Sequence, residues 1–192
     1  YIDQTSPFDR GLRPVSGKVN LPADRYLGEA WSKDSTDKVS VWYRAEHDVN
    51  DWLTLRQMTR WDESHKQRLV SDLRSVGSDG RTLARRANDG DERIRTLDMQ
   101  FEAIARFTTG GLAHTFLTGF EYINGARNND TDQATLASID IYNPVYGAQP
   151  GRFAFNERSR FDLESYSVYL QDQIDLSDQW KLILGARYDD TR

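Results

Sequence analysis

The stretch TLDMQFEAIARF (residues 96–107) decides the fold class of this chain. Its odd-numbered positions, from Leu97 to Phe107, are all apolar, and its even-numbered positions are polar with the single exception of Ile104. Successive side chains of a β-strand point to opposite faces, so this alternation predicts a strand with one apolar and one polar face. An amphipathic helix would instead repeat its apolar residues roughly every three to four positions. We therefore predict an all-β protein.

The same period of two recurs on both sides of this stretch. Alternating runs cover residues 39–46, 53–60, 116–122, 166–174 and 180–190. Residues 48–51, 108–111 and 175–179 are rich in Asp, Asn, Ser, Thr and Gly and predict tight turns, and Gly77–Gly80 predicts a further hairpin. We expect about six strands, with short turns on one side and long polar connections at 4–36 and 127–160 on the other, as in outer-membrane barrels.

Composition points the same way. Of the 192 residues, 38% are hydrophobic and 29% are charged, the mean hydropathy is −0.75, and aromatic residues still reach 11%. A soluble α/β enzyme is expected to carry more aliphatic residues, whereas a barrel with wet loops and a lipid-facing wall fits these values. No apolar run approaches the ~18 residues of a transmembrane helix.

Charge and cysteine content exclude other classes. The net charge of −5, with basic residues scattered among acids, predicts no nucleic-acid partner. The absence of cysteine excludes a disulfide framework and a zinc–thiolate site. The chain opens at Tyr1 without a start Met or an apolar leader and stops inside an alternating run, so we expect it to be a piece of a longer protein.

Several stretches, in the same order, resemble the TonB-dependent siderophore receptors of the ferrichrome-type branch. They are YLGE (26–29), LTLRQ (53–57), TG (109–110), HTFL (114–117), GFEY (119–122), IYNPVYG (141–147), YLQDQ (169–173) and WKLILGARYD (180–189). The resemblance implies that residues 1–192 are an antiparallel meander within an outer-membrane barrel of about 22 strands, roughly a quarter of it. The plug, the signal peptide and the remaining strands would lie outside this chain.

By this resemblance the whole protein imports ferric siderophores across the bacterial outer membrane, driven by TonB through the missing plug. The siderophore is then a transported ligand, and no resident cofactor is expected. The expected partners are the TonB complex, outer-membrane lipid and lipopolysaccharide, and the full-length protein is expected to be a monomer.

The resemblance also implies ligand contacts. A ferric siderophore is a bulky preformed complex, so its receptor supplies aromatic walls and a few donors rather than iron ligands. Phe8 and Arg10 match a ligand-facing stretch of the family. Four aromatic residues of a predicted external loop are further candidates, namely Tyr142, Tyr146, Phe153 and Phe155. For each aromatic residue taken alone, packing within the loop is the expected role. For the four together, we expect that at least one contacts the ligand.

No enzyme or metal site is expected. The chain has no G-x-S-x-G elbow, H-E-x-x-H pair or phosphate-binding glycine loop. His47 and His114 fall beside predicted turns and are expected to be solvated hairpin residues. The acidic tracts at 88–92 and 128–132 are expected to be solvated loops, with divalent-cation contact as the second possibility.

Two tryptophans and the function of the chain each allow more than one interpretation. Trp52 and Trp180 follow turns, which suits an interfacial aromatic girdle or plain hairpin packing. A soluble β-sandwich or lipocalin-like binding module is the second function, and a barrel enzyme is the third. Detergent dependence separates the first two functions, and we expect residues 1–192 alone to aggregate because an incomplete barrel exposes strand edges.

Overall fold

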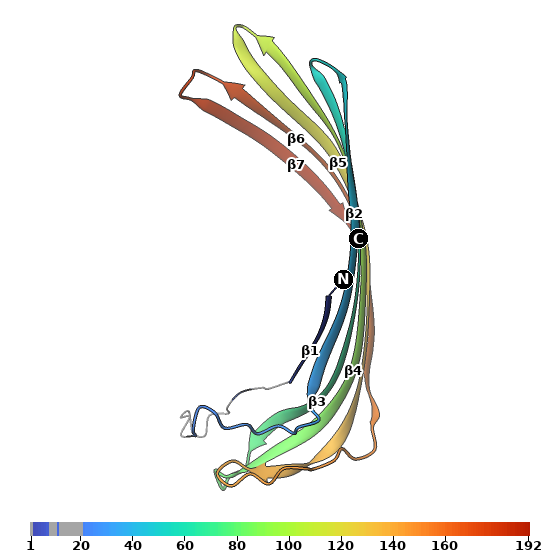
Figure 1. Cartoon of the computed structure of the whole chain (residues 1–192), viewed down its shortest axis with the longest axis vertical. Coiled ribbons are helices and arrows are strands. Elements are labelled where there is room, and N and C mark those ends of the chain that lie inside the picture. Colours follow the sequence, from blue (N-terminus) through green and yellow to red (C-terminus); the bar gives the residue numbers. More distant parts are fainter. Residues whose placement is uncertain (1, 8–10, 12–20) are drawn as a thin grey trace. The chain divides into compact units, whose positions relative to one another are not determined.

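The computed structural model describes residues 2–7, 11 and 21–192. The strands are β1 Ile2–Pro7, β2 Lys33–Asn50, β3 Leu53–Val76, β4 Thr82–Thr109, β5 Leu112–Asp140, β6 Ala154–Asp175 and β7 Lys181–Thr191 (Figure 1). They form one seven-stranded sheet in the order β1 to β7. The predicted all-β antiparallel meander is therefore confirmed. Within the described ranges, no helix is long and apolar enough to cross a membrane.

The described residues form seven strands, where the alternation predicted about six. Strand β1 overlaps the start of the connection predicted at 4–36, and it pairs with β2 from Ile2 opposite Lys38 to Pro7 opposite Lys33. The sequence IDQTSP has no apolar alternation, and the side chains of residues 2–5 are exposed. Backbone pairing with β2 makes it a strand, and side-chain periodicity does not report such pairing.

The connection predicted at 127–160 is shorter in the structure. Strand β5 continues to Asp140 and β6 begins at Ala154, so the irregular part is shorter than predicted. The acidic tracts at 88–92 and 128–132 accordingly lie in β4 and β5 and not in loops. Opposite charges on neighbouring strands stabilise such polar strand ends, as where Arg158 Nη1 lies 2.9 Å from Asp132 Oδ1.

The predicted tight turns are confirmed. Between β2 and β3, Asn50 Oδ1 accepts the backbone N–H groups of Trp52 (3.1 Å) and Leu53 (2.9 Å). Between β4 and β5, Gly110 and Gly111 have φ values of 59° and 85°, a region that favours glycine. The alternating runs therefore begin and end where their turn residues predict.

The chain forms two compact units, and each has its own packing. The first unit comprises residues 1–38, 64–93 and 128–160, and the second comprises 39–63, 94–127 and 161–192. The first unit has a small apolar core. Its buried members are Leu27, Leu73, Leu83, Ile139 and Ile141.

The second unit is organised by two faces. Its apolar face carries, among others, Val41, Ala45, Leu55, Phe101, Phe120 and Val168. Many of these side chains are exposed, including Val41 at 61% and Val168 at 53%. A soluble sandwich or lipocalin-like module would bury this face, so the packing does not support a soluble module.

Candidate functional site

A buried ion pair anchors the β5–β6 connection of the first unit. Arg85 Nη2 of β4 lies 2.9 Å from Glu29 Oε1, and both side chains are only 1% exposed. This Arg85–Glu29 contact is an ion pair, and Oε1 of Glu29 accepts no hydrogen bond in it. The other carboxylate oxygen, Oε2, accepts the backbone N–H of Gly147 at 2.8 Å. Glu29 therefore ties the segment before β2 both to β4 and to the connection after β5.

Side chains of the segment 21–32 make further hydrogen bonds to the same connection. Trp31 Nε1 donates to the Ala148 carbonyl (2.9 Å), and Arg25 Nη1 donates to the Tyr142 carbonyl (3.2 Å). In the opposite direction, the Tyr146 hydroxyl donates to the Tyr26 carbonyl (2.7 Å). Segments more than a hundred positions apart in sequence therefore dock along their length.

The predicted ligand contacts fall in three places. Phe8 and Arg10 lie outside the described residues. Tyr142 and Tyr146 lie on the docked connection with 42% and 49% of their surfaces exposed. Phe153 is half-buried, and Phe155, at the start of β6, is 70% exposed with the Arg158 guanidinium 5.3 Å from its ring centre.

A guanidinium group lies near the ring of Tyr142. The Arg81 guanidinium lies 6.0 Å from its ring centre, and Arg81 is itself ion-paired with Asp140. The Asp140 carboxylate also accepts the backbone N–H groups of Tyr142 (2.9 Å) and Asn143 (3.1 Å). An exposed aromatic ring with an arginine near it is suited to an anionic or strongly polar ligand.

Sequence reasoning did not find the residues that hold this connection. Glu29 drew notice only as part of the YLGE stretch, and Arg85 belongs to no motif. A charged residue in a polar sequence gives no sign that it will be buried, because burial depends on the partner that tertiary packing supplies.

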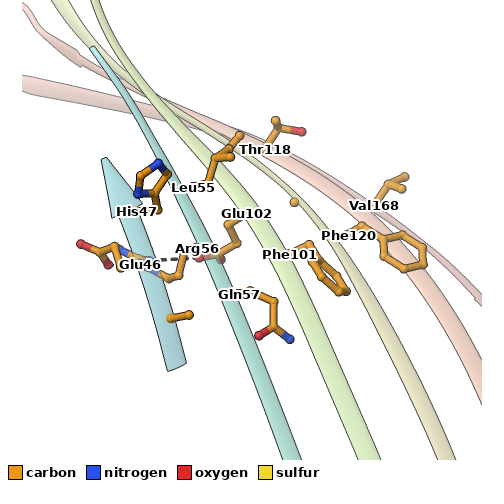
Figure 2. A pocket seen from close by; sticks show the side chains of 13 residues that line it. Glu46, His47, Leu55, Arg56, Gln57, Phe101, Glu102, Thr118, Phe120 and Val168 are labelled. Atoms are coloured by element: carbon orange, nitrogen blue, oxygen red, sulfur yellow. Dashed lines mark hydrogen bonds and ion pairs between the residues drawn. The ribbon is translucent and has the colours of Figure 1, made fainter. Parts of the chain in front are cut away.

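The polar face of the second unit carries a chain of paired charges. Arg44 Nη2 lies 2.7 Å from Glu46 Oε2, which lies 3.0 Å from Arg56 Nε. Arg56 Nη1 in turn lies 3.0 Å from Glu102 Oε2, and the Tyr169 hydroxyl donates to Glu102 Oε1 at 2.9 Å. Figure 2 shows Glu46, Arg56 and Glu102 linked across β2, β3 and β4.

The network extends to the last strand of the sheet. Glu121 accepts a hydrogen bond from Gln100 Nε2 at 2.7 Å and pairs with Arg187 of β7. Arg187 also lies 2.8 Å from Asp189, and the Ser167 hydroxyl donates to the same carboxylate at 2.6 Å. Paired charges of this kind suit a polar wall that contacts water or another polar surface.

The apolar face contains a shallow hollow of about 660 Å³. Figure 2 shows the side chains that line it, including Leu55, Phe101, Phe120 and Val168. His47 also lines it, close to the β2–β3 turn. Exposed apolar side chains around such a hollow suit contact with an apolar phase rather than chemistry.

One polar residue of the apolar face, Asp172 of β6, has its own partner. It lies on the same side of β6 as Val168 and Leu170, where an isolated carboxylate is unfavourable. His114 Nδ1 lies 2.8 Å from Asp172 Oδ2, and the His114 ring stacks on Phe107 with centroids 5.0 Å apart. The predicted solvated state of His114 is therefore wrong, because its side chain is paired and only 13% exposed.

The histidines and carboxylates of the described residues form pairs and not a metal-ligand cluster. No group of three or more His, Cys, Asp or Glu side chains suited to a metal ion occurs among them. Of the other two histidines, His47 lines the apolar hollow, and His65 pairs with Asp91 at 2.6 Å.

Comparison with known proteins gives one family. The family described as TonB dependent receptor-like, beta-barrel matches residues 1–192. The metal-pseudopaline receptor CntO of Pseudomonas aeruginosa is 28% identical over 192 residues, covering 95% of this chain and 27% of that protein. The ferrioxamine B receptor of Salmonella typhimurium is 29% identical over 150 residues, covering 78% of this chain and 21% of that protein.

Solved structures show the same fold. The ferric-catecholate import receptor Fiu of Escherichia coli K12 superposes with a TM-score of 0.86 at 22% identity, over 98% of this chain and 30% of that chain. The ferric preacinetobactin receptor BauA of Acinetobacter baumannii gives a TM-score of 0.76 at 18% identity, over 95% and 29%. The chain thus spans about a quarter of the length of the curated relatives that it matches.

Proposed function

Because the chain belongs to the TonB-dependent receptor β-barrel family, we propose that it is part of an outer-membrane receptor that imports a ferric siderophore. The match over residues 1–192 carries this proposal. The named ligands of its relatives are ferrioxamine B, catecholate siderophores and metal-pseudopaline, all of them metal chelates. The shared chemistry is recognition of a preformed complex, so the receptor needs no iron ligand or resident cofactor of its own.

The two faces of the second unit support placement in a bacterial outer membrane. The exposed apolar face, with its hollow, suits lipid contact, and the paired charges of the polar face suit the inside of a barrel. The whole protein would act as a monomer, contact lipopolysaccharide, couple to TonB through a plug outside this chain and catalyse no reaction.

The docked β5–β6 connection is the best candidate for ligand contact within the described residues. It presents Tyr142 and Tyr146 from a fixed backbone, with Arg25 and Arg81 beside Tyr142. Phe153 and Phe155 remain candidates, as do Phe8 and Arg10, which lie outside the described residues. Aromatic walls with a few donors match the needs of a bulky chelate.

The test is uptake of radioactive iron by iron-starved cells that lack other siderophore receptors and express the full-length gene. Ferrioxamine B, ferrichrome and a ferric catecholate are supplied separately. We expect accumulation of at least one complex, abolished when TonB is removed. Accumulation of none of them, with the protein present in the outer membrane, would contradict the proposed function.

Variants then address the site. Changing Tyr142→Ala together with Tyr146→Ala should lower uptake, whereas Tyr188→Ala on the apolar face, a more exposed tyrosine, should leave it unchanged. Equal uptake by the double variant and the wild type would remove these two tyrosines from the ligand site.

A further inference from the structure

The Glu29 carboxylate divides its two oxygens between two different parts of the first unit. Oε1 lies against the Arg85 guanidinium, and Oε2 accepts the N–H of Gly147. Both charged side chains are 1% exposed. A charge that is removed from water in this way needs its partners, because solvent cannot replace them.

Arg85 connects this carboxylate to the strands. Its Nε donates to the Ala137 carbonyl of β5 at 2.9 Å, and its Nη1 donates to the Leu27 carbonyl at 3.2 Å. Leu27 belongs to the apolar core of the unit. The pair therefore fixes the segment 21–32 on the strands, and the Gly147 bond fixes the connection on that segment.

The β5–β6 connection is anchored through its backbone, and side chains between the anchored groups are exposed. Between the anchored carbonyl of Tyr142 and the anchored N–H of Gly147, Val145 is 81% exposed. Segments that open and close on a ligand have few buried contacts. Here the anchor is among the most buried polar groups of the described residues, so the connection is built as a fixed surface.

We propose that Glu29 is a positioning residue for ligand capture, which holds residues 142–148 as a preformed wall by pairing with Arg85 and accepting the Gly147 N–H. This inference rests on the proposed function for the identity of the ligand. It assigns Glu29 no contact with the siderophore. Preorganisation of this kind strengthens binding because the wall does not need to be ordered when the ligand arrives.

Two double variants of the full-length receptor separate positioning from folding. Glu29→Gln with Arg85→Met and Glu29→Leu with Arg85→Met both remove the buried charges, which avoids an unpaired ion. Both also lose the Arg85 bonds equally. They differ in whether residue 29 can still accept the Gly147 N–H.

The first readout is amide hydrogen exchange over residues 145–148 in the detergent-solubilised receptor, without ligand. We expect exchange to be faster by about 10- to 100-fold in the Leu variant than in the Gln variant, the value of a hydrogen bond to a buried acceptor. Equal exchange in the two variants would overturn the proposal.

The second readout is the Kd for the ferric complex that the wild type accumulates. We expect it to be weaker by about tenfold in the Leu variant than in the Gln variant, with equal thermal unfolding of the two. Equal Kd values with unequal exchange would overturn the role in capture. If the wild type accumulates no siderophore, the proposed function fails, while the exchange readout still decides whether Glu29 positions the wall.

Discussion

Replacing Gly119 by alanine places a methyl group where the ring of Tyr169 already lies. A Cβ atom built at Gly119 would come within 2.6 Å of both the Cε2 and the hydroxyl oxygen of Tyr169. Real Cβ atoms do not approach carbon or oxygen so closely, so the ring must move. The ring crosses from β6 over the glycine of β5 to reach Glu102 on β4. An aromatic side chain that covers a glycine on a neighbouring strand is a known stabilising arrangement in β-sheets.

The magnitude follows from what the ring loses. Its hydroxyl donates to the Glu102 carboxylate at 2.9 Å, and a hydrogen bond to a charged group contributes about 1.5–3 kcal/mol. The Arg187 guanidinium lies 5.4 Å from the ring centre, which adds about 0.5–1 kcal/mol. Alanine returns about 0.4–1 kcal/mol because it restricts the unfolded chain. We expect Gly119→Ala to lower the free energy of unfolding by about 1–3.6 kcal/mol.

The assay is urea unfolding of the full-length receptor in lipid vesicles, followed by tryptophan fluorescence. The control is the same change made in a Tyr169→Ala background, where the methyl group meets no ring. There Gly119→Ala should be neutral or stabilising by up to about 1 kcal/mol. The reasoning is refuted if Gly119→Ala leaves the free energy of unfolding unchanged in the wild-type background. It is also refuted if the loss of free energy persists in the Tyr169→Ala background.

Three further predictions concern other parts of the chain. His114→Ala should destabilise the receptor by about 1–3 kcal/mol because it leaves Asp172 unpaired on the apolar face, and His114→Leu with Asp172→Leu should recover most of the loss in the same unfolding assay. Asp79 lies in the exposed β3–β4 turn. Hydrogen bonds from Thr82, mainly from its side chain and secondly from its backbone N–H, lower the pKa of Asp79 to about 2. Because the pKa is lower in the folded state, the ionised Asp79 carboxylate stabilises the turn fully at pH values above the ordinary pKa of 3.8. This contribution is lost as the pH falls to about 2. Protection of the Thr82 amide against hydrogen exchange, measured relative to the intrinsic exchange rate at each pH, should therefore decrease in this window, and Asp79→Asn should remove the dependence. Residues 1–192 expressed alone should aggregate without detergent, and a cooperative melt of the soluble monomer would contradict this.

The strands of the second unit could be predicted because their evidence is local. Alternation over residues 97–107 assigns both the strand and its two faces, and the turn residues at 108–111 end it. The first part of β4 and the last part of β5 were not predicted because polar and apolar residues are mixed on both of their faces, so their sequences do not alternate. Their strand state depends on partners on the neighbouring strands, such as Arg86 with Gln133 (2.7 Å), and no local pattern reports them.

The candidate site divides in the same way. An exposed position for Tyr142 and Tyr146 follows from a turn-rich aromatic stretch between two strands. Asp172 falls on the apolar side of the alternating run 166–174, and no nearby residue in the sequence identifies its partner. His114 lies 58 positions away and becomes its neighbour only when β5 and β6 pair.

The sequence by itself determined that the chain is a β-meander with one apolar and one polar face, because a period of two is a property of neighbouring residues. Only the tertiary structure decided that Glu29 is buried, that it pairs with Arg85, and that it holds Gly147, which is 118 positions away. The physical reason is that the cost of burying a charge depends on groups that other segments supply. Those groups are identified only when strand pairing and packing bring the segments together.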